Sequence, residues 1–236
     1  ALMAEELGAN DAVFLPSFTF TATAEVVLLA GAVPVFVDVA EESCSLDAAD
    51  LEQRIEAVKA EGRLRPRAVI AVDLHGHPAN YDALAPLCER EGLFLLSDAA
   101  QSFGSSLHGR PTGSIAPVTA TSFFPAKPLG CYGDGGALLT NDSARADLYR
   151  SLRTHGSGGG KYDIVRVGLN SRLDTLQAAV LLAKLEIFED ELAARERFAS
   201  QYDERLRGHV TLPARRDGAT STWAPYTIQV DRRSSV

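Results

Sequence analysis

A single lysine stands in a stiff and apolar stretch of this sequence. Lys127 lies between Pro125 and Pro128 in "TSFFPAKPLGCYGDGGALLT", and several glycines follow it. Pro128 biases the lysine toward an extended backbone, and the glycines permit close backbone approach. Burial would disfavour the ammonium form and leave a nucleophilic amine. We therefore expect Lys127 to be a reactive amine, whereas taken alone a lysine in such a loop is usually a surface residue.

A second ionisable residue ends an apolar run. Asp98 follows "LFLLS" and is expected at the carboxyl end of a buried strand, where ligands of open α/β sheets bind. A carboxylate removed from water there needs a cation or hydrogen-bond donors. Two interpretations stay open: Asp98 caps a following helix, or it pairs with a protonated heterocyclic nitrogen.

A lysine and an aspartate at neighbouring strand ends indicate a site for pyridoxal phosphate. The amine would condense with the cofactor's aldehyde, and the carboxylate would keep the pyridine nitrogen protonated so that the ring accepts electrons. Ser122, at a strand end before Lys127, would bind the phosphate, and Phe20 in "PSFTFTATA" would stack on the ring. Both have ordinary alternatives, a serine bonded to nearby backbone and a core phenylalanine.

The elements that must position these residues alternate along the chain. The predicted strands are 12–15, 34–39, 68–74, 93–97, 119–123 and 136–140. The predicted helices are 23–30, 47–60, 81–91 and 144–154. Asp47 is a credible N-cap, and Gly31, Gly62 and Gly92 follow helix ends. Because the strands are apolar throughout, they indicate a mainly parallel sheet covered by helices on both faces, the α/β class.

The last part of the chain has a different pattern. One long helix is predicted from Thr175 to about Leu206, apolar in its first half and charged in its second. It is interpreted either as a connection to a second domain or as a surface helix. We expect a large domain (1–174), a connecting helix (175–207) and the start of a small domain (208–236). The first residues are typical of a helix end and the last of a strand just begun, so we expect an internal piece of a longer protein.

The composition of the 236 residues argues against several classes of protein. Hydrophobic residues make up 46% and charged residues 23%, which is typical of a globular chain with a sizeable core. The net charge of −8 argues against nucleic acid as a partner. No run is apolar for long enough to cross a bilayer. Cys44, Cys88 and Cys131 match no metal spacing and fit the reduced thiols of a cytoplasmic protein.

Two motifs suggest other chemistry on first reading. "HGSGGGK" (155–161) resembles a phosphate-binding loop, but Tyr162 stands where that motif needs Ser or Thr, so we interpret it as a loop near the site. His75 and His77 would share one face of a strand. They lack a third ligand for zinc, so we interpret them as loop or substrate-lining histidines.

Several stretches together resemble the DegT/DnrJ/EryC1/StrS family, pyridoxal-phosphate aminotransferases that act on nucleotide-linked ketosugars. They include "SDAAQSFGSSLHGRPTGS", "TSFFPAKPLGCYGDGGALLTND" and "GLNSRLDTLQAAVLLAKL", and they run in family order over nearly the whole chain. The resemblance implies the large domain of a fold-type I pyridoxal-phosphate transferase, followed by a small α+β domain.

The resemblance also implies roles for five residues around the cofactor. Lys127 would carry the cofactor covalently and move the proton. Asp98 would bond the pyridine nitrogen, and Gln101 would bond the ring 3-hydroxyl. Phe20 would stack on the ring, and Ser122 would bind the phosphate.

Two more residues are implied to cross a subunit interface. Asn170 would reach the phosphate of the neighbouring subunit and Arg172 its sugar nucleotide, so the resemblance implies a homodimer with shared active sites. The amino-acid sequence of these stretches is most similar to the branch that aminates UDP-2-acetamido-3-keto-glucuronate for polysaccharide and O-antigen biosynthesis. The resemblance implies L-glutamate as the amino donor. A 4-keto-6-deoxy nucleotide sugar is the alternative substrate.

Two rival functions remain for comparison. In a related dehydratase a histidine replaces the lysine, and Lys127 argues against that enzyme. A non-catalytic regulator or scaffold would have a degraded site, whereas Lys127, Asp98, Gln101 and Ser122 are all in place. The family's Gly-Thr turn, which binds phosphate at a helix start, and most of the small domain lie outside the sequence, so the functional prediction concerns the parent protein.

Overall fold

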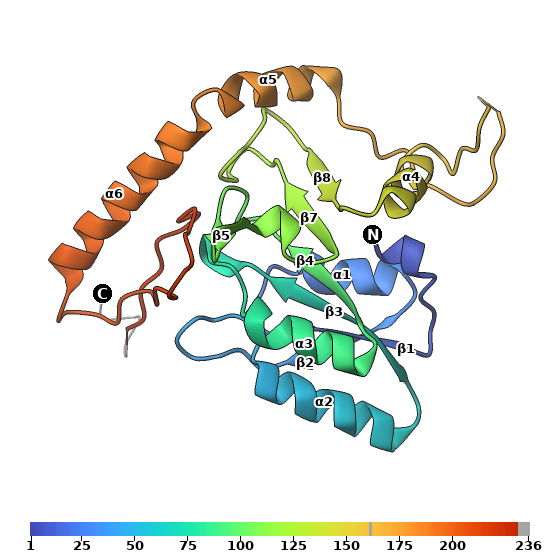
Figure 1. Cartoon of the computed structure of the whole chain (residues 1–236), viewed down its shortest axis with the longest axis horizontal. Helices are drawn as coiled ribbons and strands as arrows, with labels where there is room; N and C mark the ends of the chain where they lie inside the picture. Colours follow the sequence, from blue (N-terminus) through green and yellow to red (C-terminus); the bar gives the residue numbers. More distant parts are fainter. Residues whose placement is uncertain (161, 231–236) are drawn as a thin grey trace.

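A six-stranded sheet forms the centre of the fold (Figure 1). In the computed structural model, residues 1–160 and 162–230 are described, so Lys161 and the end of the predicted last strand lie outside the described residues. The sheet has the order β2-β1-β3-β4-β7-β8, and all neighbours are parallel except β7 and β8. The mainly parallel α/β architecture is therefore confirmed. The strands are β1 (Asp11–Pro16), β2 (Val33–Val37), β3 (Arg65–Val72), β4 (Phe94–Asp98), β7 (Val118–Ser122) and β8 (Gly136–Leu139).

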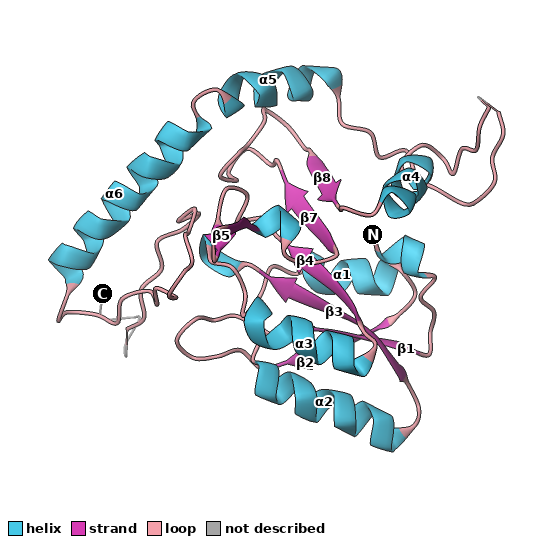
Figure 2. Ribbon diagram, viewed as in Figure 1, coloured by secondary structure: helices cyan, strands magenta, loops and turns pink. Residues whose placement is uncertain are grey.

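α-Helices follow β1, β2, β3 and β8, whereas only short elements lie between β4 and β7 (Figure 2). The α-helices are α1 (Ala22–Leu29), α2 (Ala48–Glu61), α3 (Tyr81–Glu91), α4 (Ser143–Leu152), α5 (Thr175–Leu185) and α6 (Phe188–Leu206). The short elements are η1 (Leu2–Glu5), η2 (Leu74–Gly76), η3 (Thr112–Ser114) and the two-stranded pair β5 (Ser106–Leu107) and β6 (Arg110–Pro111). No helix in the described part of the chain has the length and apolar character to cross a membrane.

Local signals begin and end the helices as predicted. The Asp47 carboxylate accepts hydrogen bonds from the backbone N–H groups of Ala49, at 2.7 Å, and Asp50, at 3.1 Å, which satisfies two donors at the start of α2. Gly62 ends the same helix in the left-handed region with φ of 67°, where a side chain would be strained.

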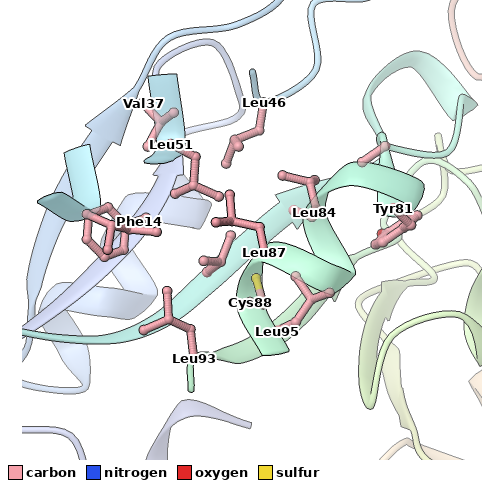
Figure 3. Packing of buried hydrophobic residues seen from close by; sticks show 14 of the residues in the cluster. Phe14, Val37, Leu46, Leu51, Tyr81, Leu84, Leu87, Cys88, Leu93 and Leu95 are labelled. Carbon is pink, nitrogen blue, oxygen red and sulfur yellow. The ribbon is translucent and has the colours of Figure 1, made fainter. Parts of the chain in front are cut away.

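The two faces of the sheet carry separate cores. Phe14 of β1 and Val69 of β3 are fully buried on one face, where they pack with α2 and α3 (Figure 3). The neighbouring residues along the same strands, Val13 and Ile70, point to the other face and belong to the cluster that includes residues of α1 and α4. Because side chains alternate along a strand, continuous apolar strands require cover on both sides.

The long helix predicted from Thr175 is wrong in one respect, because it is broken. α5 ends at Leu185, two residues form a turn, and α6 begins at Phe188. Phe188 is buried in a cluster with Phe123 and Leu181, and its ring lies 5.8 Å from that of Phe103. The turn lets this side chain reach the cluster while α6 takes a new direction away from the sheet (Figure 1).

Residues that follow α6 return along it toward the sheet (Figure 1). The indole N–H of Trp223 donates to Glu196 at 2.6 Å, and the Tyr226 hydroxyl donates to Asp203 at 2.7 Å. Arg215 bridges the same two carboxylates. Glu196 and Asp203, in the charged half of α6, therefore bind the segment that follows the helix, rather than only facing water.

We predict that Leu51→Ala destabilises the fold by about 2–4 kcal/mol, because Leu51 is fully buried in the core between α2 and the sheet. Urea denaturation measures the free energy of unfolding. Gln53→Ala, on the exposed face of the same helix, is the control and is expected to change it by less than about 0.5 kcal/mol. Equal effects of the two substitutions would contradict this account of the core.

Candidate active site

Asp98 ends the strand that lies near the middle of the sheet. β4 has β3 on one side and β7 on the other, so the carboxyl ends of the three parallel strands meet around this residue. Its Oδ2 accepts a hydrogen bond from the Thr23 hydroxyl at 3.2 Å, and its Oδ1 accepts one from the Ala100 N–H at 3.1 Å. A turn over residues 100–104 follows, not a helix, so the interpretation of Asp98 as a helix cap is wrong.

The electrostatic setting of Asp98 is unbalanced. Burial raises the pKa of its carboxyl group, while the hydrogen bonds from Ala100 and Thr23 and the positive charge of Lys127 act to lower it. Burial is the largest of these effects. A protonated ring nitrogen would supply the missing cation, which is the chemistry that the sequence predicts for this position.

Lys127 lies in a tight loop between β7 and β8. Its backbone N–H donates to the Phe124 carbonyl at 2.8 Å, and the N–H of Cys131 donates to Phe123 at 2.8 Å, so the loop folds back on itself. A Cβ on Gly130 would lie 2.5 Å from the Pro125 carbonyl oxygen, which explains the glycine there. The Lys127 side chain is half-buried rather than fully buried, and its charge acts on Asp98.

Ser122 and Gln101 stand on the two strand ends beside these residues. Ser122 is the last residue of β7, and its hydroxyl oxygen accepts from the Phe124 N–H at 3.2 Å. This is the ordinary backbone contact considered above, and it leaves the hydroxyl proton available to a ligand. Gln101 follows Asp98 in the turn, and its Oε1 accepts from the His75 N–H at 2.6 Å.

Phe20 lies in the loop that leads into α1. Its side chain is 72% exposed, so the alternative of a core phenylalanine is wrong. The same loop and the first turn of α1 carry Thr19 and Thr23, whose hydroxyls lie 3.0 Å apart. Sequence reasoning missed Thr23 as a partner of Asp98. The only signal was a run of threonines between a strand and a helix, in "FTFTAT".

Asn170 and Arg172 lie between α4 and α5, apart from the residues that contact Asp98. Both are exposed, and the Arg172 Nε donates to the Asn170 side-chain oxygen at 3.1 Å. Arg172 lines a hollow of about 1310 Å³ together with Arg150 and Arg153, between β8, α4 and residues 171–173. That lining reaches Ala120, the strand partner of Asp98, but includes none of Asp98, Gln101, Ser122 and Lys127. Within one chain the structure therefore does not bring Asn170 and Arg172 to the candidate site.

The two histidines that the sequence placed on one strand lie in a turn instead. β3 ends at Val72, and η2 follows, with His75 in the left-handed region at φ of 60°. The expectation that His75 and His77 share a strand face is therefore wrong. The His77 ring packs edge-on against Trp223 at 4.7 Å, and its Nε2 is buried with no hydrogen-bond partner among the described atoms.

Gly156, in the stretch that suggested a phosphate loop, has a structural use. Ser157 pairs with Ile164 in an antiparallel bridge, so the chain doubles back. A Cβ on Gly156 would lie 1.9 Å from the Arg166 carbonyl oxygen, which no side chain could accept. The close approach of two backbones accounts for that glycine without a bound phosphate.

The residues gathered at the strand ends fit pyridoxal phosphate. Asp98 offers a buried carboxylate that lacks sufficient positive charge. Lys127 offers an amine within electrostatic reach of that carboxylate, and Ser122 offers a hydroxyl. The set has a partner for a ring cation, for an aldehyde and for a phosphate, which are three of the polar groups of that cofactor.

Comparison with known proteins agrees with this chemistry. The profile of the DegT/DnrJ/EryC1/StrS aminotransferase family matches residues 1–235. The UDP-2-acetamido-2-deoxy-3-oxo-D-glucuronate aminotransferase of Pseudomonas aeruginosa is 45% identical over 99% of this chain and 63% of its own length. The dTDP-3-amino-3,4,6-trideoxy-alpha-D-glucose transaminase of Streptomyces venezuelae is 38% identical over 100% of this chain and 61% of its own.

A solved structure shows the same fold. The crystal structure of a DegT DnrJ EryC1 StrS aminotransferase from Brucella abortus superposes with a TM-score of 0.97 and 53% sequence identity, over 99% of this chain and 63% of that one. The chain thus spans just under two thirds of the length of the relatives that it matches.

We predict that Asp98→Asn stabilises the cofactor-free protein at pH 7. Because the pKa of Asp98 is raised in the folded state, its ionised form opposes folding. Wild-type stability should fall as the pH rises from the unfolded-state pKa of about 3.8 through the raised folded-state pKa. Urea denaturation between pH 4 and pH 8 measures this loss.

The asparagine variant should lack this part of the pH dependence, so its advantage should shrink toward acid pH. Asp147→Asn, at an exposed position on α4, is the control and should leave the pH profile unchanged. A variant less stable than the wild type at pH 7 and equal to it in acid would contradict the assignment of an uncompensated carboxylate.

Proposed function

Because the chain belongs to the DegT/DnrJ/EryC1/StrS aminotransferase family, we propose that the protein transfers an amino group to a nucleotide-linked ketosugar, with pyridoxal phosphate as cofactor. The observation that carries the proposal is the position of Asp98, half-buried at the end of β4, with its pKa raised and the charge of Lys127 acting on it. A buried, undercompensated acid beside a reactive amine is a cost to stability that a bound cationic ring would offset.

Each residue of the site would hold one part of the cofactor. Asp98 would bond the pyridine nitrogen, and Ser122 would donate its hydroxyl proton to the phosphate. Gln101 would use its amide nitrogen on the ring 3-hydroxyl, since its oxygen is taken by the His75 N–H. Phe20, exposed on the loop before α1, would cover the ring. When bound, the cofactor withdraws electrons from the carbon that carries the transferred nitrogen.

Lys127 would both anchor the cofactor and move the proton. Its backbone is fixed by the bond to Phe124 and by the close packing at Gly130, so the flexible side chain works from a rigid base. The free amine of Lys127 would remain on this fixed loop, where its Nζ would accept and return the transferred proton. General acid–base transfer by such a positioned group contributes a factor of about 10²–10⁴ to the rate.

The relatives support a proposal for the acceptor, and the family resemblance supports one for the donor. We propose L-glutamate as donor and UDP-2-acetamido-3-keto-glucuronate as acceptor, within polysaccharide or O-antigen biosynthesis. The 45% identity to the Pseudomonas enzyme supports this acceptor, and the Streptomyces relative at 38% is named for a dTDP-linked sugar. Arg172 suits a uronate because a guanidinium holds a carboxylate through two parallel hydrogen bonds.

The proposed assembly is a homodimer with shared sites. Asn170 and Arg172 are exposed and are not brought to Asp98 within one chain. We propose that they act on the cofactor phosphate and the sugar nucleotide of the neighbouring subunit. The proposed division at residues 174 and 207 assigns both to the large domain.

We predict that Lys127→Ala in the full-length protein abolishes the visible absorbance of the bound cofactor, because the covalent attachment is lost. Release of 2-oxoglutarate from glutamate should fall by at least about 10³-fold, since both the anchor and the proton carrier are removed. Lys59→Ala, an exposed lysine on α2, is the control. Visible absorbance that persists in Lys127→Ala and is fixed by borohydride would refute the proposal.

We also predict that Arg172→Met raises KM for the UDP-linked uronate by about 10- to 100-fold, the range expected for a lost charged hydrogen bond. Amination of a dTDP-linked ketosugar that lacks a carboxylate should change far less. 2-Oxoglutarate release with each acceptor measures both values. Arg63→Met, at an exposed helix end, is the control. An equal loss with both sugars would assign Arg172 to another role.

A further inference from the structure

One buried carboxylate near the site has no part in the proposed function. Asp73 follows β3 directly and is fully buried. Its Oδ1 accepts hydrogen bonds from the Ala79 N–H at 2.9 Å and from the Tyr81 hydroxyl at 2.8 Å, and its Oδ2 accepts one from the Ser102 hydroxyl at 2.7 Å. These partners come from the segment after η2, from α3, and from the turn after β4.

The three donors are neutral, so Asp73 is held without a paired cation. Burial raises the pKa of Asp73 to about 6, and the negative charge of Asp98 adds to the rise. The Tyr81 hydroxyl also bonds to Ser97, which extends the network beneath Asp98. Burial of this charge costs stability, yet hydrogen bonds hold it in one geometry. A function that requires the segments bonded to Asp73 to keep their positions would account for that cost.

That arrangement includes Gln101. Ser102, which donates to Asp73, is the next residue in the chain, and the Asp73 N–H donates to the Asp98 carbonyl at 3.0 Å. The two turns that Asp73 joins also meet at Gln101 itself, because the His75 N–H donates to its Oε1. The Asp73 carboxylate therefore ties together the two segments that orient this one side chain.

The orientation of the Gln101 amide follows from its contact. A backbone N–H must be accepted by oxygen, so the amide nitrogen Nε2 is the end left for a ligand. None of the hydrogen bonds recorded between described residues uses that nitrogen. The backbone oxygen of Gln101 accepts from Thr222 at 2.5 Å, which fixes the turn from a third direction.

The segment that supplies the His75 N–H requires such restraint. His75 has φ of 60°, a left-handed conformation that is unfavourable for a non-glycine residue. A Cβ on Gly76 would lie 2.2 Å from the Thr222 hydroxyl, so the turn is packed closely on its outer side. The bond from the Ala79 N–H to Asp73 holds the end of this strained turn. Without it, the turn would relax and the His75 N–H would no longer be held against Gln101.

We propose that Asp73 is a positioning residue that acts through Gln101. It joins the turn after β3 to the turn after β4 and so aims the Gln101 amide nitrogen at the cofactor ring held by Asp98. The inference rests on the proposed function, because it assigns the direction of Gln101 toward that ring. It predicts that loss of the Asp73 contacts weakens cofactor binding only while Gln101 is present.

A double-mutant cycle in the full-length protein tests this coupling. Ser102→Ala removes one donor to Asp73 and is expected to raise the dissociation constant for pyridoxal phosphate about 5- to 10-fold, as for one lost hydrogen bond. Gln101→Ala alone should weaken binding similarly. In the Gln101→Ala background, Ser102→Ala should then change the dissociation constant by less than about twofold.

Two further variants make the result specific. Asp73→Asn, which cannot accept three hydrogen bonds in the same geometry, should show the same dependence on Gln101. Ser45→Ala, a buried serine between β2 and α2, is the control and should leave cofactor affinity unchanged in either background. Urea denaturation of each variant records the stability change separately, so a general loss of fold is visible as such.

The outcomes separate this inference from the proposed function. Equal fold-changes for Ser102→Ala with and without Gln101, or no change in wild-type background, would overturn the positioning role and assign Asp73 to stability alone. If the wild-type protein shows no visible absorbance with pyridoxal phosphate that depends on Lys127, the proposed function itself fails. If the Lys127-dependent absorbance is present but the losses of cofactor affinity from Ser102→Ala and Gln101→Ala are additive, only the positioning role of Asp73 is rejected.

Discussion

A carboxylate buried at the end of a parallel strand, with too little positive charge around it, is the constraint on which this structure depends. Asp98 has two neutral hydrogen-bond donors and the charge of Lys127, and burial still raises its pKa. The strand order places β4 between β3 and β7, and the Asp98 side chain draws its partners from α1, from the turn after β4 and from the loop after β7. A bound cationic ring is the simplest group that completes this balance.

The loop of Lys127 and the turns around Asp98 are closely packed and hydrogen-bonded. Gly130 allows the Lys127 loop to fold against its own backbone, and Asp73 joins two turns across the strand ends. A buried Asp73 and a left-handed His75 are unfavourable in themselves. The covered sheet supplies the stability that lets them persist through its two apolar cores, the first of which includes Tyr81.

The exposed residues assigned to the site differ from the buried ones. Phe20, Asn170 and Arg172 lie on loops at the surface and are not held by Asp98 or Lys127 within one chain. Groups that meet a ligand or a second subunit must be accessible until that partner binds, so exposure is expected of them. The buried residues, in contrast, tune the electrostatics before any ligand is present.

The sequence by itself determined the strands, most helices, the cap at Asp47 and the pairing of Lys127 with Asp98 as candidate chemistry, because period, caps and strand ends are local patterns. Only the tertiary structure decided the break before Phe188, the turn at His75, the bond from Thr23 to Asp98 and the buried network of Asp73. These depend on contacts between residues distant along the chain, whose energies outweigh local preference once the sheet has packed.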